Sequence, residues 1–79
     1  MKGWCKIIET EKYDVLVQRK SDDEAEVVSV TIQTEICEVT QTLGFDENVE
    51  KADKVYLEHI DEKYCLDFIS AVEKEFLNP

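Results

Sequence analysis

Residues 61–77 read DEKYCLDFISAVEKEFL, and this stretch decides the fold. Its apolar residues recur at the spacing of one buried stripe on a helix, at Cys65, Phe68, Ile69, Val72 and Phe76. Asp61 can act as the N-cap of this helix, and Ile60 can pack on Cys65 as a hydrophobic staple. An amphipathic helix of this length needs a surface to cover, and we expect that surface to lie upstream in the chain.

Three upstream segments have the β-branched composition and the alternation that are typical of strands. They are residues 4–10, 13–20 and 27–32. Residues 10–12 are expected to form the first turn, and the polar residues 21–24 the second. We therefore expect the second and third strands to pair as a hairpin.

Two further segments fit either a strand or a helix. Residues 36–45 read ICEVTQTLGF, which Thr34 could cap as a helix and Gly44 could end, but alternation and β-branched residues favour a fourth strand. Residues 46–60 fit a helix capped by Asp46, or a strand over residues 54–60. Near-helical spacing of the apolar residues favours the helix.

The combined pattern predicts an α+β fold in one small domain, residues 1–79. We expect an antiparallel meander sheet of three to four strands, followed by two C-terminal helices, the last packed on one face of the sheet. The predicted core is Val15, Val17, Val28, Val30, Ile32, Val39, Leu43, Cys65, Phe68, Ile69, Val72 and Phe76. A core of this size gives a net stability of only a few kcal/mol.

The composition predicts a cytoplasmic location. The sequence has no apolar signal region at its start and no uninterrupted apolar run near the roughly 20 residues that span a bilayer, so we expect neither export nor a membrane anchor. Three widely spaced cysteines, Cys5, Cys37 and Cys65, have apolar neighbours. We expect all three to be buried free thiols in a reducing compartment.

Charge is the strongest departure from an ordinary composition. The chain has nineteen acidic residues against nine basic ones, for a net charge of -10. Residues 1–20 carry five bases and three acids, whereas residues 21–79 carry four bases and sixteen acids. Direct binding to nucleic acid or to an anionic membrane needs clustered Lys and Arg, which most of the chain lacks. Neither is therefore expected.

The sequence lacks the patterns of catalytic, metal and cofactor sites. His59 is the only histidine, and the cysteines lie on predicted apolar faces, so we expect no Cys–His pair. No Cys-x-x-Cys spacing indicates zinc, and residues 46–57 lack the glycine and the last glutamate of a calcium loop. The two glycines are too far apart for a phosphate-binding loop. We therefore expect neither an enzyme nor a bound metal or cofactor.

The acidic residues gather at a hairpin tip and across the helical region. The candidate partner-binding residues are Asp22, Asp23, Glu24, Glu26, Asp46, Glu47, Glu50, Asp53, Glu58, Asp61 and Glu62. Carboxylates at strand and helix spacing can imitate a phosphate path and occupy an Arg- and Lys-lined channel. In its size, charge and lack of catalytic groups the chain resembles the small acidic proteins with which phages block host defence, including anti-CRISPR proteins. This resemblance implies a non-enzymatic inhibitor.

The sequence is compatible with two kinds of binding function. The first is a protein that inhibits or sequesters a basic, nucleic-acid-handling partner through a carboxylate-rich face. The second is an interaction module that docks by a strand edge or an apolar patch, with the charge serving only solubility. Trp4 bears on this choice, because an aromatic side chain can be an interface hot spot or can seal the bottom of a small core.

Overall fold

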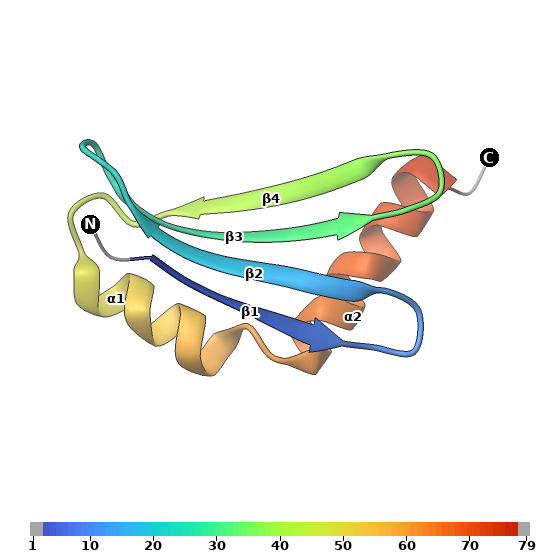
Figure 1. The fold of residues 1–79 in the computed structure, drawn as a ribbon, viewed down its shortest axis with the longest axis horizontal. Helices are drawn as coiled ribbons and strands as arrows, with labels where there is room; N and C mark the ends of the chain where they lie inside the picture. Colours follow the sequence, from blue (N-terminus) through green and yellow to red (C-terminus); the bar gives the residue numbers. More distant parts are fainter. Residues whose placement is uncertain (1–2, 78–79) are drawn as a thin grey trace.

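The computed structural model describes residues 3–77 as a four-stranded sheet with helices on one face (Figure 1). The strands are β1 (Gly3–Glu9), β2 (Asp14–Ser21), β3 (Glu26–Gln33) and β4 (Glu38–Gly44). They pair antiparallel in the order β1-β2-β3-β4, which is the predicted meander. The alternation in residues 36–45 thus identified the fourth strand correctly.

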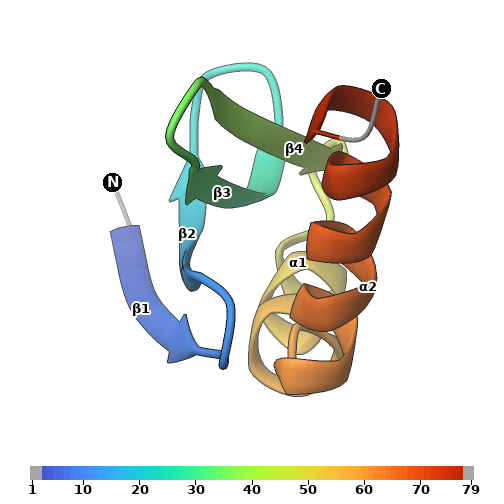
Figure 2. The ribbon, with the colours of Figure 1, turned by 90° about the vertical axis from the view of Figure 1, so that its right-hand side faces the viewer.

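Two helical segments follow the sheet. The first is α1 (Val49–Lys54), which continues into η1 (Val55–His59). The second is α2 (Glu62–Val72), which continues into η2 (Glu73–Leu77). The η segments have the wider winding of a π-helix. Both helical segments lie on the same side of the sheet (Figure 2), so the predicted α+β fold is confirmed.

At the start of each helical segment, a side chain accepts a hydrogen bond from a backbone amide of the first turn. The Asp61 carboxylate accepts the Tyr64 amide at 2.9 Å, so the predicted cap of the last helix is confirmed. For the first helix the predicted cap is wrong, because Asn48 accepts the Lys51 amide at 3.0 Å. Asp46 has a φ of 51°, in the left-handed region that Asp tolerates, and turns the chain from β4 toward α1.

The core lies between the sheet and the two helical segments. The predicted core residues that are buried are Val15, Val17, Val28, Val30, Ile32, Cys65, Ile69 and Val72. Val39, Leu43 and Phe68 are partly buried against them. The predicted core set omitted Ala52, Tyr56 and Ile60, which are buried on the first helical segment and at its end.

Phe76 is wrongly predicted as a core residue, because 56% of its surface is exposed. It lies in η2, where the winding changes from α to π. A π turn contains more residues than an α turn, so the α-helical period that was used to extend the stripe past Val72 does not hold there. The spacing argument therefore fails in the last turn of the helix.

We expect Phe68→Ala to lower the free energy of unfolding by about 2 kcal/mol, because its ring packs on the core and its loss leaves a void. On the same helical segment, Phe76→Ala should change it by less than about 0.5 kcal/mol, because the ring is exposed. Urea titration of both variants measures the two effects. Equal losses would show that α2 presents a different face to the sheet.

The three cysteines differ in their exposure, and none forms a disulfide. Cys65 is buried and Cys37 is half-buried, but Cys5 is exposed. The prediction of three buried thiols is therefore wrong for Cys5, whose neighbours Trp4 and Lys6 reach Tyr56 on the helix-covered side. Alternation along β1 directs Cys5 to the face of the sheet that no helix covers.

We expect a thiol reagent to modify Cys5 rapidly in the folded protein and Cys65 only after unfolding. Burial raises the pKa of the Cys65 thiol, so little reactive thiolate forms there. Mass spectrometry at successive times of alkylation identifies the modified residue. As a control, Cys5→Ser should remove the rapid phase, whereas rapid labelling of Cys65 in the native state would contradict its place in the core.

Candidate functional site

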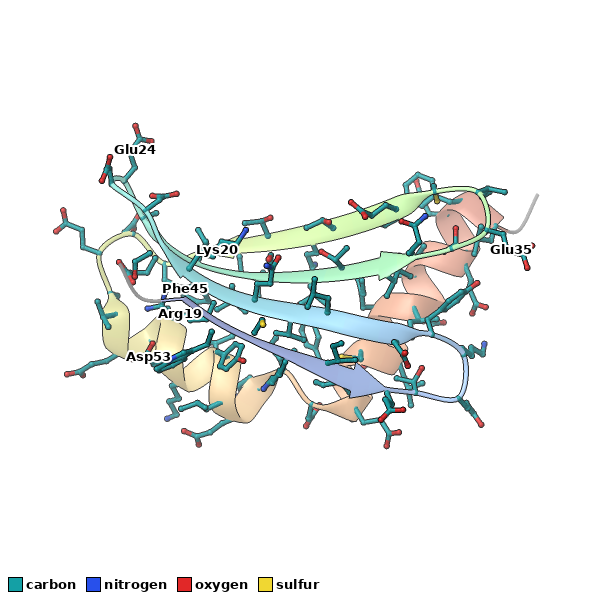
Figure 3. All side chains as sticks on the ribbon, viewed as in Figure 1. Arg19, Lys20, Glu24, Glu35, Phe45 and Asp53 are labelled. Carbon is teal, nitrogen blue, oxygen red and sulfur yellow. The ribbon has the colours of Figure 1, made fainter. Side chains whose placement is uncertain are left out.

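Exposed carboxylates from two separate segments meet at one end of the sheet. The residues are Asp22, Asp23 and Glu24 in the β2–β3 turn, and Asp46, Glu47 and Glu50 between β4 and the first turn of α1. Backbone hydrogen bonds join the two segments, since the Glu26 amide donates to the Asp46 carbonyl and the Phe45 amide donates to the Glu26 carbonyl. Both segments lie at the left of Figure 1, where Figure 3 labels Glu24. We call these six residues the acidic end.

The β2–β3 turn is held in shape by one of its own carboxylates. The Oδ1 atom of Asp22 accepts the backbone amides of Glu24, at 2.8 Å, and of Ala25, at 2.7 Å. These bonds favour the charged carboxylate, so they hold the pKa of Asp22 below its usual value. The turn is therefore both ordered and negatively charged at neutral pH.

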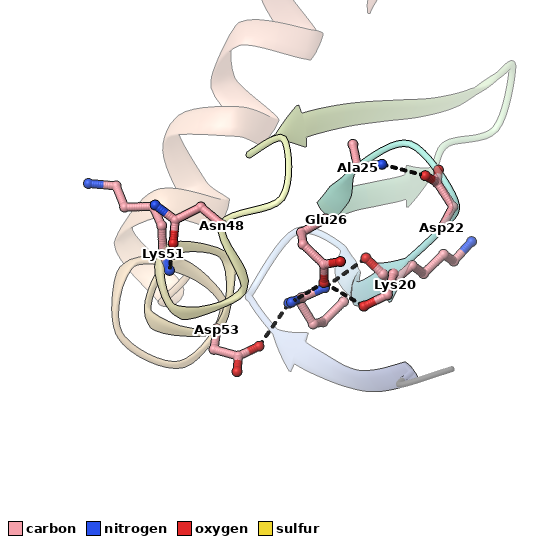
Figure 4. Close-up of polar contacts among 9 residues, drawn as sticks. Lys20, Asp22, Ala25, Glu26, Asn48, Lys51 and Asp53 are labelled. Atoms are coloured by element: carbon pink, nitrogen blue, oxygen red, sulfur yellow. Dashed lines mark hydrogen bonds and ion pairs between the residues drawn. The ribbon is translucent and has the colours of Figure 1, made fainter.

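Two other candidate carboxylates, Glu26 and Asp53, face the interior beside the acidic end. Both bind the guanidinium of Arg19, whose side chain is fully buried. Nη2 donates to Glu26 at 2.7 Å, Nε donates to Asp53 at 3.0 Å, and Nη1 donates to the Lys20 carbonyl at 2.7 Å (Figure 4). Glu26 and Asp53 thus hold β2, β3 and α1 together from within.

Arg19 is a buried residue that was not among the predicted core residues. On β2 it follows Val15 and Val17 at alternate positions, so the alternation already placed it on the helix-covered face. A buried charge needs hydrogen-bonding partners, which Glu26, Asp53 and the Lys20 carbonyl provide for Arg19. The Ser21 hydroxyl donates a further hydrogen bond to Glu26. The Ser21 bond, and then the Arg19 bond, hold the pKa of Glu26 below its usual value.

The remaining candidate carboxylates lie at the bend between η1 and α2. Glu58 lies in η1, Asp61 caps α2, and Glu62 is the first residue of α2. In Figure 1 this bend lies below the sheet, separated from the acidic end by the length of α1 and η1. The structure therefore divides the predicted acidic face into the acidic end, the Arg19 network and this bend.

Trp4 contributes to both the surface and the core boundary. Its ring centroid lies 5.7 Å from that of Tyr56, and 37% of the residue is exposed. The neighbouring Lys6 donates from Nζ to the Tyr56 carbonyl and lies 4.3 Å from the centre of the Tyr56 ring. Because the Ile60 amide bonds to Val55, five residues back, the Tyr56 carbonyl lacks the bond that Ile60 would give it in an α-helix. Lys6 supplies that bond and fastens β1 to η1.

Within residues 3–77, no group of His, Cys, Asp and Glu side chains has an arrangement suited to a metal ion. No helix in this part of the chain is long and apolar enough to cross a bilayer. Comparisons with protein-family models, with curated proteins and with solved structures found no match. Function is therefore inferred from the geometry and charge of this chain alone.

Proposed function

We propose that this protein inhibits or sequesters a nucleic-acid-handling protein by docking the acidic end on a basic surface of that partner. The observation that carries the proposal is the meeting of exposed carboxylates from two segments at one end of the sheet. Residues 22–26 and 46–50 contain seven acids and no base. This local excess of negative charge complements an Arg- and Lys-lined surface.

The acidic end is supported by ordered elements. Asp22 fixes the turn, and Asn48 fixes the start of α1, so the carboxylates start from defined positions. Binding groups that are already ordered lose less conformational entropy when a partner docks. Such carboxylates can occupy the guanidinium and ammonium sites that otherwise hold phosphates, and the partner would then lose access to its nucleic acid.

The proposal assigns no catalytic role to the chain. His59 is exposed on η1, and Cys65 is a buried thiol with a raised pKa, which is the opposite of what a nucleophilic cysteine requires. We place the function in the cytoplasm, where free thiols such as these persist.

Affinity capture from a lysate of the native host tests the proposal. The immobilised protein should retain a partner with a basic surface at low salt and release it as salt rises, because exposed charges are screened. Adding short DNA or RNA should also release it, since both ligands need the same Arg and Lys side chains. A partner that resists salt and nucleic acid would contradict the proposal.

A second candidate function is an interaction module that docks by a strand edge. The observation that favours it is that β1 and β4 each pair on one side only within the described chain. Main-chain hydrogen bonds give such docking much of its affinity, so it should depend less on salt than docking by the acidic end, and short DNA or RNA should not compete with it. Competition by nucleic acid therefore distinguishes the two functions.

A further inference from the structure

The two edges of the sheet are not equally open. On β1, Lys6 points to the helix-covered side and binds the Tyr56 carbonyl, while Trp4 packs on the Tyr56 ring. An inward-pointing charge is one of the features by which proteins protect an edge strand from pairing. Lys6 therefore gives β1 an inward-pointing charge that hinders the pairing of a further strand.

β4 has no inward-pointing charge, because its helix-facing residues are Val39, Gln41 and Leu43. Its sequence, EVTQTLG, contains no Lys or Pro, and most of its residues are exposed. Its register with β3 runs without a bulge from Val27–Gly44 to Gln33–Glu38. Such an edge is a template on which another strand can pair.

Hydrogen bonds at the two ends of the β3–β4 hairpin identify the free backbone groups. The Phe45 amide donates to Glu26 at one end, and the Thr34 amide donates to Cys37 at the other. Bonded and non-bonded pairs alternate along an antiparallel ladder, so the odd-numbered residues of β4 bond to β3. The outward-facing amides and carbonyls belong to Glu38, Thr40, Thr42 and Gly44.

A groove lies beside this edge, between β4 and α2. It has a volume of about 270 Å³ and is lined by Gln41, Tyr64, Asp67, Phe68 and Ala71. The Tyr64 hydroxyl donates to Oε1 of Gln41 at 2.6 Å, which joins the two walls. Phe68 is only partly covered by the core, so its ring gives the groove an apolar lining.

We propose that an extended segment of a partner protein pairs with β4 and places an apolar side chain in this groove. Residues directly opposite each other in an antiparallel pair point to the same face of the sheet. A residue opposite Gln41 therefore points toward Phe68. The free edge and the groove together select a β-strand with an apolar anchor, in the manner of other strand-addition sites.

The charge around the groove indicates which residues the partner strand carries beside its apolar anchor. Residues 35–44 and 62–77 contain six acids and two bases, so a strand beside them is best matched by Lys or Arg next to its anchor. Asp67 pairs with Lys63 at 3.2 Å, but both side chains are largely exposed and the pair is weak. This surface is distinct from the acidic end. The inference specifies the strand-edge docking given above as the second candidate function, and it does not rest on inhibition through the acidic end.

Two pairs of variants test the edge and the groove separately. Thr42→Pro removes an outward amide without removing a bond to β3, whereas Thr42→Val keeps the amide. Ala71→Trp fills the groove from α2, whereas Ser70→Trp adds the same ring at an exposed neighbour that does not line the groove. None of these positions belongs to the acidic end.

The probe is a phage-displayed library of random short peptides, selected on the immobilised full chain, with enriched peptides then synthesised. We expect them to alternate apolar and basic residues and to bind Thr42→Pro and Ala71→Trp at least about tenfold more weakly. Thr42→Val and Ser70→Trp should bind as the parent does. When a selected peptide is added to the parent protein, the amide chemical shifts of residues in β4 and α2 should change.

No enrichment, binding that both Thr42→Pro and Ala71→Trp leave intact, or shifts confined to β1 would overturn the proposal. Circular dichroism checks that each variant is folded. If Thr42→Pro does not fold, Ala71→Trp and the chemical shifts of the parent decide the result. A variant with Asp23, Glu24 and Glu47 replaced by Lys should still show the peptide-induced shift changes on β4. A result that contradicts docking by the acidic end is therefore distinguishable from one that contradicts docking on β4.

Discussion

Arg19→Ala is expected to lower the free energy of unfolding by about 3 to 5 kcal/mol, as is usual when one partner of a buried ion pair is removed. The Arg19 side chain is fully buried and binds both Glu26 and Asp53. Without the guanidinium, two carboxylates face each other beside the core, and the space that Arg19 filled is empty. In a small domain this loss is a large part of the total stability, and urea titration measures it.

Two controls separate the network from a general loss of positive charge. Lys20→Ala removes an exposed neighbouring cation whose backbone carbonyl alone contacts Arg19, so stability should change by less than about 0.5 kcal/mol. Arg19→Met combined with Glu26→Gln and Asp53→Asn replaces the ions with neutral groups of similar size, and should recover part of the loss. If Arg19→Ala unfolds at the same urea concentration as the parent, the network does not form in solution.

The Arg19 network also predicts how stability depends on pH. The Ser21 hydroxyl and then Arg19 hold the pKa of Glu26 below its usual value, so the folded state binds fewer protons in acid than the unfolded state. This stabilisation is complete above the usual glutamate pKa and is lost as pH falls through the lower folded pKa. Asp22 acts in the same direction. Urea titrations at successive acidic pH values should show a shallower dependence in Arg19→Ala.

Local patterns were sufficient to predict the arrangement of strands and helices. Side chains alternate between the faces of a strand, and this alternation identified residues 36–45 as β4 although they also contain helix signals. The errors lie where the backbone leaves the regular pattern. Both Asp46 and Asn48 can cap a helix, and only the chain path shows which takes the left-handed turn. The change to π winding at Glu73, in the segment where Phe76 is exposed, likewise cannot be read from the spacing of the apolar residues.

The candidate site was less predictable because it depends on contacts between distant residues. Arg19 and Asp53 are 34 positions apart, and no local pattern shows that they meet. The acidic end also requires the β3–β4 register, which brings Asp46 to Glu26 and so joins the two acidic segments. Sequence alone identified the acidic residues, but not which of them face solvent together.

Because the carboxylates of the acidic end are separate from those that bind Arg19, only the former can test the proposed function. Asp53 binds Arg19, so reversing its charge would disturb the fold as well as any docking surface. Asp23, Glu24 and Glu47 are exposed members of the acidic end. We expect Asp23→Lys, Glu24→Lys and Glu47→Lys together to weaken binding of the captured partner by about 3 kcal/mol or more, while each reversal alone acts mainly on the association rate.

The matched control reverses three exposed acids at the opposite end of the molecule. Glu11, Glu35 and Glu75 lie in the β1–β2 turn, in the β3–β4 turn and in η2, at the right of Figure 1. Their replacement by Lys changes the net charge by the same amount as the triple variant of the acidic end. The Debye length is about 8 Å at physiological ionic strength, so charges at the far end of the molecule are screened from a partner bound at the acidic end. The control variant should therefore lose much less affinity for the partner than the variant of the acidic end.

Titration calorimetry of the parent and both triple variants, with unfolding curves for each, gives the deciding comparison. The proposal requires that the acidic-end variant remains folded, loses affinity and no longer displaces short DNA or RNA from the partner. Equal losses from both variants would mean that total charge, and not the acidic end, attracts the partner. If the acidic-end variant binds as tightly as the parent and nucleic acid does not compete, the mimicry proposal is wrong. Docking by a strand edge would then account for the binding, since main-chain pairing does not depend on these carboxylates.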